Sequence, residues 1–208
     1  MQSITTIGLD IAKSVFQVHG VDAKGHVLIR RQLKRRYVLA FFQRLPPCLV
    51  GIEACASSHH WSRELQALGH AVRLMPPAYV KPYVKRQKND AADAEAICEA
   101  VTRANMRFVE TKTPEQQSCL MLHRTRHLFI RQQTAVINAI RAHLAEFGVV
   151  APVGRNGVEE LLDVIADPKD NRVPEVAREC LAALGRQLHM LKVRILEFDR
   201  HMTIAVCG

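Results

Sequence analysis

The sequence lacks several features, and each absence excludes a class of protein. It has no apolar run long enough to span a membrane and a mean hydropathy of -0.04, which excludes an integral membrane protein. Its six cysteines include no C-x-x-C pair, and no export signal is recognisable, so we expect reduced thiols in a bacterial cytoplasm, associated with the nucleoid. Aromatic residues make up only 5% of the chain, so base stacking is not the obvious way for it to bind nucleic acid.

Acidic residues are also in deficit. Asp and Glu total 20 against 29 Lys and Arg, which gives a formal net charge of +9. A basic chain favours a polyanionic partner, and nucleic acid is the first candidate. The hydrophobic share of 48% over 208 residues excludes wholesale disorder and suffices for a packed core.

Cysteine and histidine offer a minor alternative. A zinc site built from Cys48 or Cys55 with His59 or His60 is conceivable, but the spacing fits no common zinc motif, and part-buried cysteines are the simpler interpretation. The two histidines also follow Glu53 closely, so a role as proton shuttle or DNA contact is a second alternative to exposed histidines at a helix start.

The first 110 residues alternate strand-like and helix-like segments. Period-two alternation, turn signals and helix-stopping glycines and prolines predict the order strand, strand, strand, helix, strand, helix, strand, helix. The predicted strands are 7–11, 15–21, 26–33, 48–54 and 70–75, and the predicted helices are 37–45, one capped by Ser57 or Ser58 and ended by Gly69, and one from Asn89 to about Asn105. A meander followed by crossover connections predicts an α/β fold, with a mixed five-stranded sheet flanked by helices.

From about residue 113 the pattern is almost entirely helical. We expect long helices at about 115–147 and 174–205, with a short helix at 158–166 between them. Apolar residues on the last helix step by four and three from Ala177 to Met202, which is typical of a coiled-coil seam. The simplest arrangement is an antiparallel pair within one chain, and pairing between two chains is the alternative. The predicted domains are therefore 1–112 and 113–208.

Four carboxylates stand out in the first domain. Asp10 lies in the first strand among apolar neighbours, where a carboxylate is costly unless it is paired or bound to a cation. Glu53 ends the fourth strand, and Asp90 and Asp93 share one face at the start of a helix. If these side chains converge, two divalent cations, Mg²⁺ or Mn²⁺, would offset their repulsion and act on a phosphodiester. Taken singly, each acid has a plain structural interpretation as a turn former, loop acid or helix-start residue.

Whole segments around these acids resemble one family. The segments Gly8–Lys13, Gly51–Cys55, Lys88–Ile97 and Asn138–Gly148 are similar to the DEDD transposases of insertion-sequence family one-ten, especially its eleven-eleven branch. The resemblance implies a ribonuclease-H-like, RuvC-type catalytic domain followed by a helical coiled-coil region. It also implies that Asp10, Glu53, Asp90 and Asp93 are the metal ligands and catalytic residues.

The resemblance carries further expectations about partners. It implies DNA at the element ends and target as substrate, a guide RNA as second partner, and a homo-oligomer formed through the coiled coil. Family members have a later domain that supplies a nucleophilic serine, and the serines of this chain lie in no such context. We therefore expect the chain to be the front part of a transposase that lacks its serine domain.

Clusters of basic residues fit a nucleic-acid partner, because each can contact a phosphate. We expect such contacts from Arg30, Arg31, Lys34, Arg35, Arg36, Lys81, Lys85, Arg86, Lys88, Arg124 and Arg131, with Arg126 and Arg141 on the same long helix. For any one of them, an exposed solvated side chain is the plainer interpretation.

Two other functions remain as alternatives. One is a remnant that binds DNA, RNA or the intact transposase without cleaving. The other is an actin-like or sugar-kinase ATPase, which shares a Gly-x-Asp strand and hairpin but requires a second glycine-rich phosphate loop that this sequence lacks.

Overall fold

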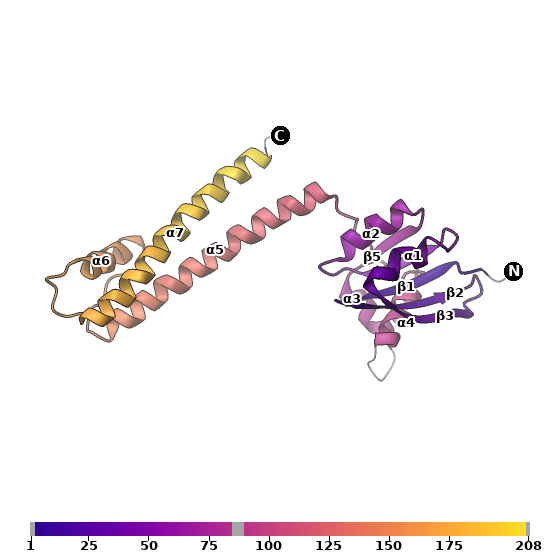
Figure 1. Ribbon diagram of the computed structural model, residues 1–208, viewed down its shortest axis with the longest axis horizontal. Coiled ribbons are helices and arrows are strands. Elements are labelled where there is room, and N and C mark those ends of the chain that lie inside the picture. Colours follow the sequence, from indigo (N-terminus) through magenta and orange to yellow (C-terminus); the bar gives the residue numbers. More distant parts are fainter. Residues whose placement is uncertain (1–2, 85–89, 207–208) are drawn as a thin grey trace. The chain divides into compact units, whose positions relative to one another are not determined.

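The computed structural model describes residues 3–84 and 90–206 (Figure 1). The chain divides into two compact units, Met1–Thr113 and Pro114–Gly208. The first contains a sheet covered by helices, and the second is helical. No helix in the described part of the chain is both long and apolar enough to cross a membrane.

One mixed sheet forms the centre of the first unit. Its strands are β1 (Thr6–Ile11), β2 (Val15–Val21), β3 (Val27–Lys34), β4 (Leu49–Glu53) and β5 (Ala71–Met75). Their order is β3-β2-β1-β4-β5, in which β1, β2 and β3 pair antiparallel and β1, β4 and β5 pair parallel. This confirms the predicted five-stranded mixed sheet, and it brings the carboxyl ends of β1, β4 and β5 to one edge.

Helices cover both faces of this sheet (Figure 1). The helical elements of the first unit are η1 (Arg35–Tyr37), α1 (Val38–Phe42), α2 (Ser58–Ala67), α3 (Pro77–Val80), η2 (Lys81–Tyr83) and α4 (Asp90–Ala100). On one face, Ile7 and Leu9 of β1 pack in a core with Phe42 of α1 and Trp61 of α2. On the other face, α4 crosses β1, β2 and β4.

Several predicted helix limits need correction. α4 ends at Ala100 rather than near Asn105, and Ala104, inside the predicted helix, lies beyond its end and is exposed. Ser57 is the N-cap residue of α2 but makes no side-chain capping hydrogen bond. The hydroxyl of Ser58 instead donates to the Cys55 carbonyl oxygen, at 2.9 Å. The predicted cap Asn89 lies outside the described residues.

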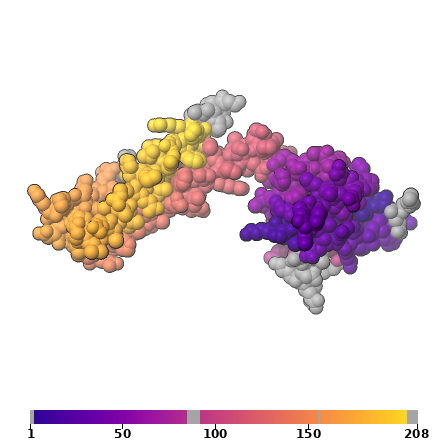
Figure 2. All heavy atoms as spheres, in the orientation of Figure 1, coloured from indigo at the N-terminus to yellow at the C-terminus, as the bar shows by residue number. Residues whose placement is uncertain are grey.

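The second unit is an antiparallel helix pair with a third helix packed at one end (Figures 1 and 2). Its helices are α5 (Pro114–Ala145), α6 (Arg155–Ala166) and α7 (Glu175–Val206). Phe129 of α5 contacts Phe198 of α7 edge to face, with ring centroids 5.4 Å apart, and Arg126 pairs with Asp199. These contacts confirm the predicted antiparallel pairing within one chain.

The core of this unit occupies only part of the predicted seam. Ile140 and Leu144 of α5 and Leu188 of α7 are fully buried, together with residues of α6. Towards the free ends of the pair, seam residues such as Ile195 and Phe198 are only half-buried. The core is thus deepest where α6 covers the pair.

Candidate functional site

Asp10 and Glu53 lie on neighbouring parallel strands. β1 and β4 pair with Gly8 opposite Gly51 and Leu9 opposite Ile52. Asp10 and Glu53 are the next residue on each strand, so the same register places them side by side, about 4.8 Å apart along the pairing direction. This register is consistent with convergence of the two side chains, which stays a prediction.

Both acids lie on the face of the sheet that α4 covers. Side chains alternate along a strand, so Asp10 shares a face with Gly8, and Glu53 shares it with Gly51. A Cβ on Gly8 would lie 2.1 Å from the Ala94 carbonyl oxygen. A Cβ on Gly51 would lie 2.8 Å from the Cβ of Val101. α4 therefore rests directly on Gly8, and Val101, the residue after the helix, rests on Gly51; each glycine precedes its acid by two residues.

α4 runs towards Asp10 from the far end of β1. Its Cys98 thiol contacts the Thr6 carbonyl oxygen at 3.9 Å, and Ala94, one turn earlier in the helix, lies over Gly8. One helical turn advances about 5.4 Å and two strand residues about 6.6 Å, so the next turn towards the N-terminus of α4 approaches the level of Asp10. Asp90 belongs to that turn, and Asp93, which is half-buried, directly precedes Ala94.

The described residues do not complete a metal site. They contain no group of three or more His, Cys, Asp or Glu side chains arranged to hold a metal ion. Asp90 lies in the first turn of α4, but its side chain is outside the described set. Asp10, Glu53 and Asp93 offer only carboxylate oxygens, the donor type that hard divalent cations such as Mg²⁺ and Mn²⁺ prefer.

Cys98 adds no reactive group to this face. Burial raises the pKa of its thiol to about 11, so the side chain stays protonated at neutral pH. It packs as a small apolar residue between α4 and β1.

The zinc alternative finds no support among its four residues. Cys48 is buried against His70, with its Sγ atom 3.4 Å from Nδ1, and Cys55 is exposed. His59 faces a different partner, because its Nδ1 atom accepts the Lys112 backbone N–H at 3.1 Å. His60 lies half-exposed near Glu64, at 3.8 Å.

His59 therefore helps to fix the position of the segment around Lys112. Together with its neighbours on α2 it holds the chain segment that follows α4. The Ser62 hydroxyl hydrogen-bonds the Thr111 hydroxyl at 2.6 Å, and the Arg63 guanidinium donates to the Lys112 carbonyl oxygen. The proton-shuttle role expected as an alternative stays a prediction.

The structure separates the predicted basic residues into engaged and available ones. Arg30 lies 3.7 Å from Glu95 of α4. The Arg35 guanidinium stacks over the rings of Phe16 and Trp61, at 5.7 and 5.2 Å from their centroids. Both are nevertheless exposed, like Arg31, Lys34, Arg36, Lys81, Arg124 and Arg131, whereas Lys85, Arg86 and Lys88 lie outside the described residues.

Two arginines of the long helices serve the fold of the second unit. Arg141 of α5 donates to the carbonyl oxygens of Ala151, Pro152 and Gly154. Arg126 pairs with Asp199 across the helix pair. Both arginines therefore make contacts inside the second unit, and phosphate contacts from them stay a prediction.

The sequence reasoning missed the two glycines under α4. The signal was present, because each acid is preceded two residues earlier by glycine, as Gly8-x-Asp10 and Gly51-x-Glu53. A glycine inside a strand marks a close approach of other backbone. At Gly8 that approach is by the backbone of α4, the helix that carries Asp90 and Asp93, and at Gly51 the close neighbour is the Val101 side chain.

Comparison with known proteins gives consistent relatives. The family model for DEDD transposases of the IS110 type, described as "Transposase", matches residues 7–148. A "Probable family 20 transposase" of Pseudomonas aeruginosa is 48% identical over 99% of this chain and 61% of its own length. The transposase for insertion sequence element IS1328 of Yersinia enterocolitica is 36% identical over 97% of this chain and 60% of its own length.

A further relative represents the branch expected from the sequence. The transposase for insertion sequence element IS1111A of Coxiella burnetii is 40% identical over 86% of this chain and 49% of its own length. The chain thus spans about half to three fifths of the length of these relatives.

Proposed function

Since the chain belongs to the IS110-type family of DEDD transposases, we propose that it takes part in metal-dependent cleavage and transfer of DNA strands. In this proposal the first unit is the catalytic domain, and its carboxylates Asp10, Glu53, Asp90 and Asp93 hold divalent cations. Two Mg²⁺ ions are the expected occupants, with Mn²⁺ as the alternative.

The observation that carries the proposal is that the carboxyl ends of β1 and β4 lie side by side. Asp10 and Glu53 continue a parallel register on adjacent strands, on the face over which α4 brings its first turn. Acidic side chains at the start of a helix are common for electrostatic reasons alone. Two acids on neighbouring strands beside that helix start are not explained in this way, and together they offer the carboxylate oxygens that a hard divalent cation binds.

The residues of the chain would divide the work. The carboxylates supply oxygen donors to the cations, and the exposed Arg and Lys side chains hold the phosphates of the substrate. Bound divalent cations supply Lewis acidity for phosphodiester chemistry. We further propose element DNA as substrate, a guide RNA as second nucleic acid, and association of chains through the α5–α7 pair.

The metal site is tested by binding, independently of activity. We expect Asp10→Asn and Asp93→Asn each to weaken Mn²⁺ binding by more than about tenfold, measured by calorimetric titration, because each removes an anionic ligand. Asp163→Asn, at an exposed acid of α6, is the matched control and should bind Mn²⁺ like the parent chain. Unchanged circular dichroism would show that the variants are folded. Wild-type Mn²⁺ affinity in both site variants would refute the carboxylate site.

Cleavage is tested separately with labelled element-end DNA, guide RNA and Mg²⁺. A nicked product that disappears in Asp10→Asn supports the proposed enzyme. Binding of DNA without any nick would favour the alternative of a binding-only remnant.

A further inference from the structure

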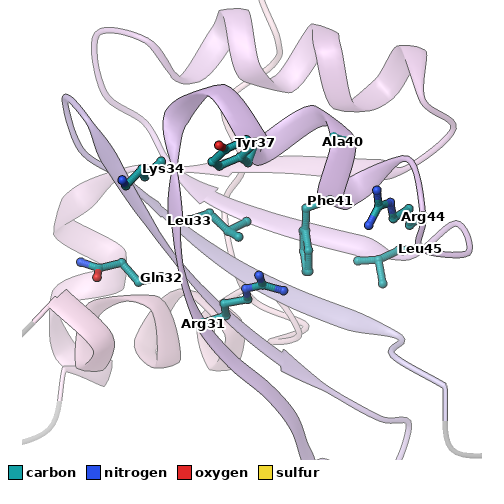
Figure 3. A pocket seen from close by; sticks show the side chains of 9 residues that line it. All are labelled: Arg31, Gln32, Leu33, Lys34, Tyr37, Ala40, Phe41, Arg44 and Leu45. Carbon is teal, nitrogen blue, oxygen red and sulfur yellow. The ribbon is translucent and has the colours of Figure 1, made fainter.

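A groove between β3 and α1 lies on the side of the sheet opposite the α4 face (Figure 3). It has a volume of about 590 Å³. That is within the size range of small-ligand pockets, about 300–1,000 Å³. The groove is lined by Arg31, Gln32, Leu33, Lys34, Tyr37, Ala40, Phe41, Arg44 and Leu45. The proposed carboxylate site uses none of these residues.

The floor of the groove is apolar and partly aromatic. Leu33 is buried, and Phe41 and Leu45 are half-buried. Figure 3 shows Phe41 extending from α1 towards Arg31 of β3, with Arg44 on the same side. Tyr37 is 51% exposed, and the Arg36 guanidinium lies 4.7 Å from its ring centroid. Arg36 thus covers one face of this half-exposed ring, which leaves the other face for a flat ligand at the groove.

The rim of the groove carries positive charge without compensation. Arg31, Lys34 and Arg44 are exposed, and no carboxylate among the described residues forms an ion pair with them. The chain has no Asp or Glu between Asp22 and Glu53. The same stretch contains Lys24, Arg30, Arg31, Lys34, Arg35, Arg36 and Arg44.

A ligand that matches this groove needs flat apolar faces and closely spaced anionic groups. Unpaired nucleotides have both, because their bases are free to stack and their phosphates follow at every residue. A duplex is a poorer match, since its base faces are covered by the neighbouring base pairs. An acidic peptide matches the rim but offers no flat face to Tyr37.

We propose that the β3–α1 groove binds single-stranded nucleic acid, with phosphates on Arg31 and Arg44 and a base stacked on Tyr37. The proposal rests on the proposed function in taking nucleic acid as the partner, but it does not depend on the carboxylates. Lys34, on the edge strand β3, extends the phosphate track beyond the groove.

The test uses the full chain and fluorescence anisotropy in the presence of EDTA. Labelled oligo(dT) and oligo(U) of about 12 nucleotides, a length within the usual site sizes, are compared with a duplex of the same length. Tyr37→Ala should weaken binding of the single strands about tenfold, the loss of one stacked base, and change duplex binding by less than about twofold. Tyr79→Ala, a 43% exposed tyrosine outside the groove, is the matched control and should leave all affinities unchanged.

A second measurement, the salt dependence of affinity, tests whether Arg44 contacts a phosphate of the bound strand. Arg44→Gln should reduce the slope of log affinity against log salt by about 0.7 for a single strand, the contribution of one phosphate contact. Arg200→Gln, at an exposed arginine of α7, should leave the slope unchanged. The oligo(dT) and oligo(U) arms show whether the strand is DNA or RNA.

Three outcomes would contradict the binding of single strands in the groove. They are wild-type single-strand binding in Tyr37→Ala, an equal loss for duplex and single strand, and binding of poly-glutamate that competes with oligo(dT) and depends on Tyr37. Because these measurements are made in EDTA, they do not depend on cation binding by the carboxylates. A failed metal site and a failed groove are therefore distinguishable.

Discussion

Gly8 and Gly51 lie two residues before Asp10 and Glu53, on the strand face that α4 covers. At Gly8 the missing side chain lets the backbone of α4 approach β1, and at Gly51 it leaves room for the Val101 side chain. At the scale of single residues, the packing over the two strands that carry the acids thus depends on two glycines.

We predict that Gly8→Ala destabilises the first unit by about 2–3 kcal/mol, because the new Cβ would meet the Ala94 carbonyl oxygen and displace α4. Urea unfolding followed by the fluorescence of Trp61, the only tryptophan, measures this. Gly25→Ala is the control, since its surroundings are open and only its positive φ of 81° opposes alanine, at about 1 kcal/mol. An equal loss in both variants would contradict close packing at Gly8.

The strand acids were predictable and the glycines were not recognised. Asp10 stands out because a carboxylate interrupts a short apolar alternation, and Glu53 because it ends another apolar run. The contact between Gly8 and Ala94 joins positions far apart in the chain, and no local pattern specifies it. Arg30 and Arg35 illustrate the same limit, because their partners Glu95 and Trp61 come from distant segments.

At the scale of elements, one arginine side chain hydrogen-bonds the free carbonyl oxygens at the end of a helix. The Arg178 guanidinium of α7 donates to the carbonyl oxygens of Val164 and Ile165, which belong to the last turn of α6, and to those of Asp170 and Val173 beyond it. Carbonyl groups in the last turn of a helix have no intrahelical partner, so this single side chain satisfies several of them. It ties α6 to α7.

We predict that Arg178→Lys destabilises the helical unit by about 1–3 kcal/mol, since an ammonium cannot reproduce the planar fork that reaches four carbonyls. Thermal unfolding followed by circular dichroism at 222 nm measures the loss. Arg194→Lys in the same helix is the matched control, because its exposed pair with Glu197 should change stability by less than about 1 kcal/mol. An equally large loss of stability in Arg194→Lys would mean that any Arg-to-Lys change in this helix is destabilising, and would contradict a special role for Arg178.

Elements with a long apolar period were predicted closely. α5 and α7 begin and end within about two residues of the expected limits, because Gly148 and Pro174 mark their ends and the period spans many turns. α4 was predicted too long. After Ala100 the chain turns back, and Val109 bridges to Leu74 of β5, so a tertiary contact ends a helix whose sequence would continue it.

At the scale of the whole molecule, the two units have separate cores. We predict that Leu188→Ala, at a fully buried leucine, destabilises the helical unit by about 2–5 kcal/mol without moving the Trp61 fluorescence transition. Gly8→Ala should move that transition and leave the main loss of helical dichroism unchanged. Met190→Ala, 62% exposed, is the control. Equal shifts of both signals would mean that the units unfold as one.

Composition predicted the kind of partner but not where it would bind. The charge of +9 indicates a polyanion, and the 5% of aromatic residues argues against stacking when averaged over the chain. The fold gathers Tyr37 and Phe41 beside Arg31 and Arg44 in one groove, although their sequence neighbourhood looks like a short amphipathic helix. An average over the chain conceals such local gathering.

The acid-free stretch that lines this groove has a practical consequence for mapping bound strands. A protease that cuts only after Asp and Glu has no site between Asp22 and Glu53, so η1, α1 and β3 would be released intact as a single peptide, residues 23–53. A nucleotide photo-crosslinked to Tyr37 or Phe41 would therefore be found in mass spectra on this one peptide, at the peptide mass plus that of the nucleotide. Trypsin, in contrast, would divide the same region at each of its cations.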